Sequence, residues 1–360
     1  KGISVIIFSF SILFYSTIIF KLFPTNISFK YQVLAQQYLN NTIDNERLLD
    51  VSPLYFYVHV AAQKLSHHPN VFILWVQIVL SAFSSVFLFH ILRSFFTLPI
   101  SLLGTLAFIT NRSVILYTST FEPEAFMIFF LLGFLVFSLK SHDVKIPVSG
   151  IFLGFSLLTR LNFVPLIVIT PIFFWLTTQY RNRLLRRVIF FEIPIIMTMS
   201  FLIVRNTTIT GSFTPFSMNP GTVFFEGNNP NSTGESAIYP PLINDVRDDF
   251  DQQPDFQHVI YRIFARRIED TPPAITDINS YWSQKARNFI YDHPAHFLKL
   301  LFIKTNFFFH NFRRHDLSDV YWNDQKLQKT IPTIPYALIS AMGLIGMVFS
   351  GKTWKNKLLI

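Results

Sequence analysis

The sequence has no cysteine and few charged side chains, which make up only 14% of its 360 residues. Without cysteine, a domain that faces an oxidising compartment such as a bacterial periplasm must hold together without disulfides. The charged residues are too few to cover the surface of a soluble protein of this length. In contrast, hydrophobic residues make up 51% of the chain, and phenylalanine alone occurs 43 times. The composition therefore predicts a membrane protein.

Long uncharged runs agree with a membrane location, because a helix needs about 20 residues to cross a hydrocarbon core. They lie at Ile3–Phe20, Asn70–Leu92, Ser94–Asn111, Ala125–Leu139, Leu161–Tyr180 and Thr330–Gly351. Two shorter runs, 146–159 and 193–204, are predicted as spans as well. No small-residue cleavage site follows the first run, so we interpret it as a retained span rather than a signal peptide. The sequence thus predicts an all-α, multispan membrane protein.

The net charge of +9 follows the expected membrane topology and gives no reason to expect a nucleic-acid partner. Basic residues cluster in alternate connections, at Arg93, Lys140, Lys145, Arg181, Arg183, Arg186, Arg187, Lys352, Lys355 and Lys357. By the positive-inside rule, these connections face the cytoplasm. Conversely, 14 of the 21 acidic residues fall between Arg205 and Ile331, so that region is predicted to lie outside.

The order of these segments predicts three parts. Residues 1–204 form an N-terminal transmembrane bundle, in which residues 21–69 make an amphipathic first outer loop. Residues 205–331 form an extracytoplasmic domain of mixed helical and irregular structure with interfacial helices, and residues 332–360 form a C-terminal span and a cytoplasmic end. The chain starts without methionine and stops after a basic cluster, so we expect it to be trimmed at both ends, with further spans after Ile360.

The spacing of apolar residues predicts several particular helices. Tyr31–Leu39 is predicted as an amphipathic helix on the membrane face, and Asp277–Tyr291 as an amphipathic helix of the outer domain. We expect His296–Phe309 to be interfacial, because a full span would place the last basic cluster outside. The 33 residues from Ile146 to Thr178 would make about 50 Å of helix, so two short or broken spans fit better than one.

The most specific pattern of the chain lies at Arg205–Gly234, which reads RNTTITGSFTPFSMNPGTVFFEGNNPNSTG. Its key residues are Arg205, Asn206, Gly211, Asn219, Gly221, Phe224, Phe225, Gly227, Asn228, Asn229, Pro230 and Gly234. The pattern resembles the start of the extracytoplasmic domain in bacterial GT-C polyprenyl-phosphate-sugar glycosyltransferases, which are related to protein O-mannosyltransferases and aminoarabinose transferases. Softer similarities lie at Pro53, at Leu158-Thr159-Arg160 and at Pro294.

This resemblance implies a GT-C-like fold and a multi-pass position, expected in the bacterial inner membrane. The implied activity is inverting transfer of a sugar from a polyprenyl-phosphate-linked donor to an acceptor hydroxyl on the extracytoplasmic face. The expected partners are this donor, membrane lipids and an acceptor that is a glycan, a lipid or a protein, with no cofactor and no metal. The alternative is a catalytically inactive relative that binds lipid-linked sugar or partners an active transferase.

Such a transfer needs cations for the phosphate, a carboxylate base for the acceptor and an apolar groove for the prenyl chain. The candidate substrate-binding residues are Arg205, Arg160, Asn206, Gly227, Asn228, Asn229, Lys299, Lys304 and Tyr31. Each also has a simpler interpretation. Arg205 could anchor the membrane interface, Lys299 and Lys304 could contact lipid headgroups, and the two asparagines could only shape a turn. Arg160 lies between two apolar runs and should pair or face a polar cavity.

The catalytic base is less clear from the sequence. In the family, an Asp of the first outer loop lies about four residues before the Tyr that starts a helix. Here the helix starts at Tyr31, and residues 26–30 read Asn, Ile, Ser, Phe, Lys, so this Asp is absent. Our leading candidate is Glu122, at the start of a later outer helix, followed by Asp44. Other candidates are Glu46, Asp50 and Glu124, although Glu124 also fits a plain acid at a helix N-terminus.

Overall fold

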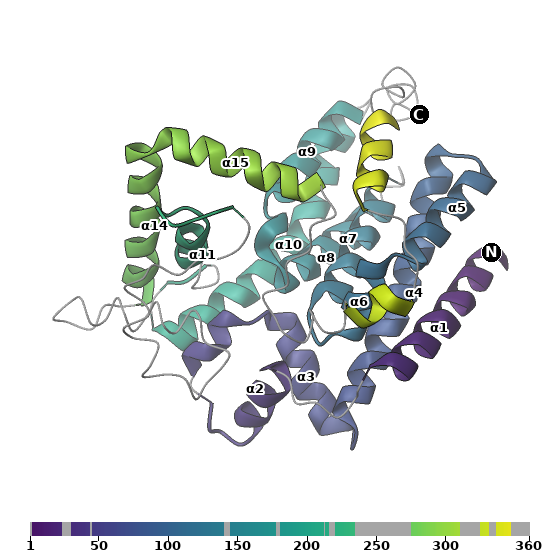
Figure 1. Cartoon of the computed structure of the whole chain (residues 1–360), viewed down its shortest axis with the longest axis horizontal. Coiled ribbons are helices and arrows are strands. Elements are labelled where there is room, and N and C mark those ends of the chain that lie inside the picture. The colour runs from purple at the N-terminus through teal and green to yellow at the C-terminus, as the bar shows by residue number, and fades with distance from the viewer. Residues whose placement is uncertain are drawn as a thin grey trace.

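The structure is a computed structural model, and the parts of the chain that it describes are helical, with no strand among them (Figure 1). The described residues are 2–23, 30–43, 45–139, 145–177, 181–211, 213–215, 220–234, 275–309, 325–330 and 336–346. The prediction of an all-α membrane protein is confirmed.

Three helices of this part are long and apolar enough to cross a membrane. They are α1 (Gly2–Leu22), α4 (Pro69–Phe95) and α10 (Arg181–Thr210). A fourth span is possible if α5 (Leu98–Ile109) and α6 (Arg112–Ser119), bent by 47°, act as one. The run 94–111 was predicted as one span, but α4 takes its first residues and α5 ends at Ile109. The bend falls where Asn111 caps α6 by accepting the backbone N–H of Ser113.

Four shorter elements complete the bundle: α7 (Glu124–Leu139), α8 (Ile146–Thr159), the 3-10 turn η3 (Leu161–Phe163) and α9 (Pro165–Thr177). The prediction of two short helices between residues 146 and 178 is confirmed. The break falls at Arg160, whose backbone is extended at φ −149° and ψ 120°. It brings a charged side chain to the junction of two apolar helices.

Small residues let α8 approach α10 closely. A Cβ atom on Gly150 would lie 2.2 Å from the carbonyl oxygen of Phe191, and one on Gly154 would lie 2.4 Å from the hydroxyl of Thr198. A contact of 2.2 Å is shorter than any real packing distance, so α8 could not sit here with alanine at position 150. The close approach fixes the middle of α10, at Phe191 and Thr198 and so before Arg205, relative to α8.

The first outer loop folds into α2 (Lys30–Leu39), the 3-10 helix η1 (Asn45–Asp50) and α3 (Pro53–Leu65). The amphipathic helix predicted at 31–39 is therefore confirmed, and Tyr31, Leu34 and Ala35 are its buried residues. These side chains belong to one apolar cluster with residues of α1, α3, α4 and α6. The loop therefore packs onto the bundle, and Tyr31 is buried in the apolar cluster that the two share.

The outer part contains α11 (Pro220–Gly227), α14 (Ile275–Asp292) and α15 (Pro294–Phe309). Figure 1 shows α11 in the corner that α14 and α15 form. The amphipathic helix predicted at 277–291 is confirmed, because Ile278, Trp282, Ala286 and Phe289 are buried. The ring of Trp282 packs on Phe225 of α11, with centroids 4.8 Å apart.

Two further predictions concern the boundary at residue 205 and the last span. Helix α10 runs without a break through the predicted boundary at residue 205 and ends at Thr210. Of the predicted last span, 330–351, the structure describes a helix at Tyr336–Gly346, preceded by a short helix at 325–330. The basic cluster 352–357 lies outside the described residues.

Candidate active site

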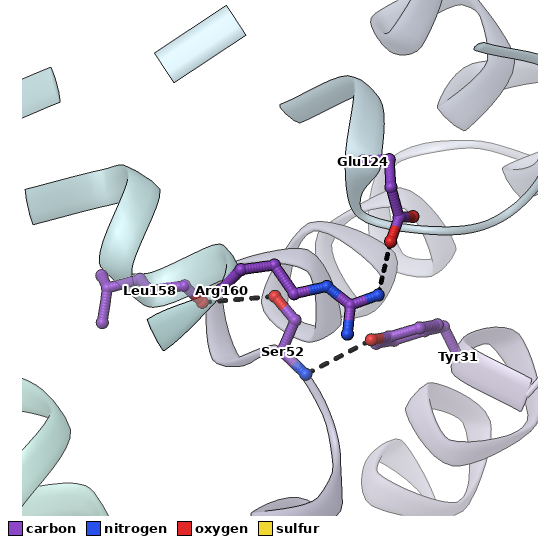
Figure 2. Close-up of polar contacts among 5 residues, drawn as sticks. All are labelled: Tyr31, Ser52, Glu124, Leu158 and Arg160. Atoms are coloured by element: carbon purple, nitrogen blue, oxygen red, sulfur yellow. Dashed lines mark hydrogen bonds and ion pairs between the residues drawn. The ribbon is translucent and has the colours of Figure 1, made fainter. Parts of the chain in front are cut away.

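Arg160 pairs with an acid from another helix. The break after α8 leaves its guanidinium beside the first residue of α7, where its Nη2 lies 2.5 Å from Oε1 of Glu124 (Figure 2). Burial opposes the charge of Arg160, but the carboxylates of Glu124 above all, and of Glu122, raise the pKa of the guanidinium. The expectation that Arg160 pairs is therefore met. Its other N–H groups have no acceptor within the described part of the chain, and its side chain is 43% exposed.

Ser52 joins the first outer loop to this cluster. Its backbone N–H donates to the hydroxyl of Tyr31 at 3.3 Å, and its own hydroxyl donates to the carbonyl oxygen of Leu158 at 3.2 Å (Figure 2). Ser52 is also the residue that precedes α3, with Pro53 at the first helical position. Ser52 therefore connects α2, α3 and the end of α8. Its contact on α8, Leu158, lies two residues before Arg160.

Glu122 lies in the turn between α6 and α7, close to the same group of side chains. Burial raises the pKa of the Tyr31 hydroxyl, and the negative charge of Glu122 raises it further. The same two causes raise the pKa of Tyr55, on α3. The carboxylate of Glu122 is half-buried and acts on Tyr31, Tyr55 and Arg160 together. The structure thus brings three of the predicted site residues, Tyr31, Glu122 and Arg160, to one place.

Arg205 lies at the outer end of α10 and is almost fully buried. Its side chain donates to the carbonyl oxygen of Leu48 at 2.7 Å, to Oδ1 of Asn206 at 2.9 Å and to the hydroxyl of Tyr57 at 3.3 Å. These contacts use three of the five guanidinium N–H groups and hold α10 to η1 and α3. Arg205 therefore connects α10 to η1 and α3 in this structure.

An apolar pocket of about 440 Å³ lies between α3, α8 and α10. It is lined by Leu54, Tyr57, Phe155, Leu158, Met197, Thr198 and Phe201. Of the lining residues, Tyr57 accepts a hydrogen bond from Arg205, and Leu158 lies two residues before Arg160 in the chain. The side chains of Met197 and Phe201, both on α10, are 69% and 51% exposed.

The conspicuous turn at residues 227–230 ends α11 and is held by its own side chains. The amide of Asn228 donates to the carbonyl oxygen of Phe224, and the amide of Asn229 donates to those of Phe225 and Glu226. Lys304 of α15 donates to the carbonyl oxygen of Gly227 at 2.7 Å, and burial lowers its pKa. A cation there complements the free carbonyls at a helix C-terminus. In this structure the turn and Lys304 join α11 to α15.

The remaining predicted residues lie apart from the carboxylate cluster. Asn206 is buried and accepts a hydrogen bond from Arg205. Lys299 is exposed on α15, and Asp44 lies outside the described residues. Among the described residues, no three His, Asp or Glu side chains gather as metal ligands would. The sequence analysis missed Ser52 and Tyr57, although Ser-Pro before an apolar helical pattern is a known helix-start signal.

Comparison with known proteins tests the resemblance at this point. Residues 50–205 match the family described as dolichyl-phosphate-mannose-protein mannosyltransferase. The matched segment is 156 of the 360 residues, and the match supports a GT-C glycosyltransferase. No curated protein and no solved structure matches the chain. Together with the apolar helices, the family match supports an integral membrane glycosyltransferase of the kind that uses polyprenyl-phosphate sugar donors.

The mannosyltransferase-family segment contains most of the cluster just described. It starts two residues before Ser52 and ends at Arg205, so it includes Glu122, Glu124 and Arg160. The turn at 227–230 lies beyond it, although that stretch carries the resemblance most clearly in the sequence. The family match and the pattern at 205–234 therefore share only Arg205, whereas the softer similarities at Pro53 and Arg160 lie inside the match.

Proposed function

We propose that this protein moves a sugar from a polyprenyl-phosphate donor to an acceptor hydroxyl on the extracytoplasmic face of a bacterial inner membrane, with inversion at the anomeric carbon. The observation that carries this proposal is the group of Glu122, Glu124 and Arg160 at the end of α8, a helix that also lines an apolar pocket through Phe155 and Leu158. A carboxylate, a cation and an apolar wall are the three elements that the reaction needs.

In the proposed reaction, Glu122 is the base. Its carboxylate takes the proton of the acceptor hydroxyl as the oxygen attacks the anomeric carbon, and the bond from that carbon to the phosphate oxygen breaks. The electron pair leaves with the polyprenyl phosphate, whose negative charge Arg160 stabilises. A single displacement from the face opposite the phosphate inverts the anomeric carbon. Glu124 holds Arg160 in place and leaves Glu122 as the acid that takes the proton.

Both arginines then contact the phosphate, in different ways. Arg160 has more N–H groups available and is the more exposed of the two, so it makes the main contact. Arg205 adds its remaining N–H groups and fixes the first outer loop. The residues of the turn, Gly227 to Asn229, and Lys304 form the rim on which the sugar or the acceptor rests, while Lys299 meets lipid headgroups.

The apolar pocket accommodates the first isoprene units of the donor. Its volume of about 440 Å³ suits several such units, and its lining is apolar apart from the Tyr57 and Thr198 hydroxyls. Exposed Met197 and Phe201 open it toward lipid, so the remaining prenyl chain can stay in the bilayer. The phosphate then lies at the outer end of the pocket, between Arg160 and Arg205.

Blocking the pocket tests this arrangement. Full-length protein in lipid nanodiscs is given radiolabelled polyprenyl-phosphate sugars, with membranes of the encoding organism as acceptor. Leu158→Trp fills the pocket and should weaken donor binding at least tenfold, whereas Leu103→Trp, on the exposed face of α5, should leave it unchanged. Equal donor affinity in all three proteins would contradict the placement of the prenyl chain.

A second candidate, a catalytically inactive relative that binds lipid-linked sugar, is favoured by one observation. The acid expected before Tyr31 is absent, since residues 26–30 are Asn, Ile, Ser, Phe and Lys. The same assay separates the two candidates. An inactive relative binds the labelled donor in the unmodified protein and transfers no label to any acceptor.

A further inference from the structure

Gln77 is a fully buried amide in the outer half of α4, a helix that is otherwise strongly apolar. A buried amide costs free energy unless its hydrogen-bonding groups are paired. Here both N–H groups and the oxygen of the Gln77 side chain have partners, which lie on two other elements. Such a fully paired amide can fix the relative position of the elements that it joins.

The amide nitrogen of Gln77 is hydrogen-bonded to the backbone segment that leads to Glu122. Its Nε2 donates to the carbonyl oxygen of Thr118 at 2.8 Å and to that of Thr120 at 2.9 Å. Thr118 lies in the last turn of α6, and Thr120 lies two residues before Glu122, in the turn that leads to α7. The hydroxyls of Ser81 and Thr118 also lie 2.8 Å apart. Helix α4 thus holds this turn from one side.

The amide oxygen of Gln77 is hydrogen-bonded to Tyr55 of α3, which packs against Tyr31. Its Oε1 accepts the hydroxyl of Tyr55 at 2.5 Å. The ring of Tyr55 packs edge-on against the ring of Tyr31, with centroids 4.7 Å apart. Tyr31 in turn is near Glu122 and bonded to Ser52. One amide therefore connects the turn that carries Glu122 with α3, which carries Tyr55, and through the ring of Tyr55 with Tyr31 on α2.

We propose that Gln77 is a positioning residue for sugar transfer, which sets the distance between Glu122 and the wall formed by Tyr55 and Tyr31. This inference rests on the proposed role of Glu122 as the base. Gln77 does not touch the donor or the acceptor. It acts through the backbone of residues 118–120, and a shift of the base by about 1 Å can cost roughly 100-fold in rate.

The test compares Gln77→Leu with Ser84→Ala in the full-length protein. Ser84 is a buried polar residue of the same helix, whose hydroxyl donates to the carbonyl of Leu80 within α4. Gln77→Leu should lower kcat about 10- to 100-fold with unchanged donor KM, because the base moves while the donor contacts remain. Ser84→Ala should keep both. A folded Gln77→Leu variant with unchanged kcat would overturn the proposal.

A double variant distinguishes positioning from general damage. If Gln77 acts through Glu122, adding Gln77→Leu to Glu122→Gln should cause little further loss, since the base is already gone. Losses that multiply would overturn the proposal. If Gln77→Leu does not fold, Tyr55→Phe, which removes one hydrogen bond of the same amide, should show a smaller loss of the same kind, and an unchanged kcat there would also overturn it. Absence of transfer by the unmodified protein would instead refute the proposed function itself.

Discussion

Arg160 and Glu124 lie 36 residues apart in the chain and 2.5 Å apart in the structure, where they join the end of α8 to the start of α7. The second oxygen of Glu124, Oε2, is buried and has no hydrogen-bond partner in the described part of the chain. In this pair the side chain of Arg160 is 43% exposed, whereas that of Glu124 is 18% exposed. We therefore propose Glu124 as the partner that holds Arg160, and Glu122 as the acid for chemistry.

Breaking this pair from either side should weaken donor binding to different degrees. Arg160→Gln removes the cation and should raise the donor Kd at least tenfold, because a hydrogen-bonded charge contributes about 1.5–3 kcal/mol. Glu124→Gln keeps the cation but loosens it, so the increase should be smaller. Equilibrium binding of a labelled polyprenyl-phosphate sugar measures both. A Kd that is unchanged in Arg160→Gln would remove Arg160 from the phosphate site.

Arg205→Ala should lower both thermal stability and donor affinity. The change removes three hydrogen bonds from a buried cation, each worth about 1.5–3 kcal/mol when the donor is charged. Arg205→Lys keeps the charge but cannot reach three acceptors at once, so it should rescue only part of either property. Thermal unfolding in detergent and donor binding are measured on the same samples. A stable Arg205→Ala variant would contradict its role as a tie, and an unchanged donor affinity would remove it from the phosphate site.

Stability should fall as the pH drops below about 6.5, because of His59. Burial among the rings of Tyr31, Tyr55 and Phe121 lowers the pKa of His59 from 6.5 to about 3. Between these values the unfolded chain holds a proton that the folded protein does not, and each pH unit costs about 1.4 kcal/mol. His59→Phe should flatten this part of the pH–stability curve. A curve of the same slope in His59→Phe would exclude His59 as its cause.

The predicted topology can be tested on the natural chain, since it has no cysteine. A single cysteine in place of Tyr291, which is 79% exposed on α14, should react with an impermeant thiol reagent in intact cells. A single cysteine in place of Arg183, in the first turn of α10, should react only after the cells are opened. Labelling at position 183 in intact cells would overturn the outer location of the site.

Local patterns in the sequence predicted much of the fold. The amphipathic helices α2 and α14 follow from apolar spacing, and the break near Arg160 follows from the length of a run that is too long for one span. The extent of α4 was not predictable in this way, because continuous apolar sequence gives no signal for a helix end. Neither was the bend before α6.

The sequence named several residues of the cluster around Arg160, but it did not predict their contacts. Arg160 carried a clear signal, because a charge between apolar runs needs a partner. The identity of that partner depends on how α7 packs against α8, and this packing is not a local property of the sequence. Gln77 likewise lies far in the sequence from its partners Thr118 and Thr120. Such pairs follow from the fold alone.

The rate of sugar transfer by Glu122→Gln tests the central claim most directly. The full-length protein and this variant are reconstituted in lipid vesicles, and transfer from a labelled polyprenyl-phosphate sugar is followed under single-turnover conditions. Glutamine keeps the size of the side chain but cannot take the proton, so turnover should fall by roughly 10² to 10⁴ while donor binding stays intact. Transfer at the unmodified rate in Glu122→Gln would contradict the account.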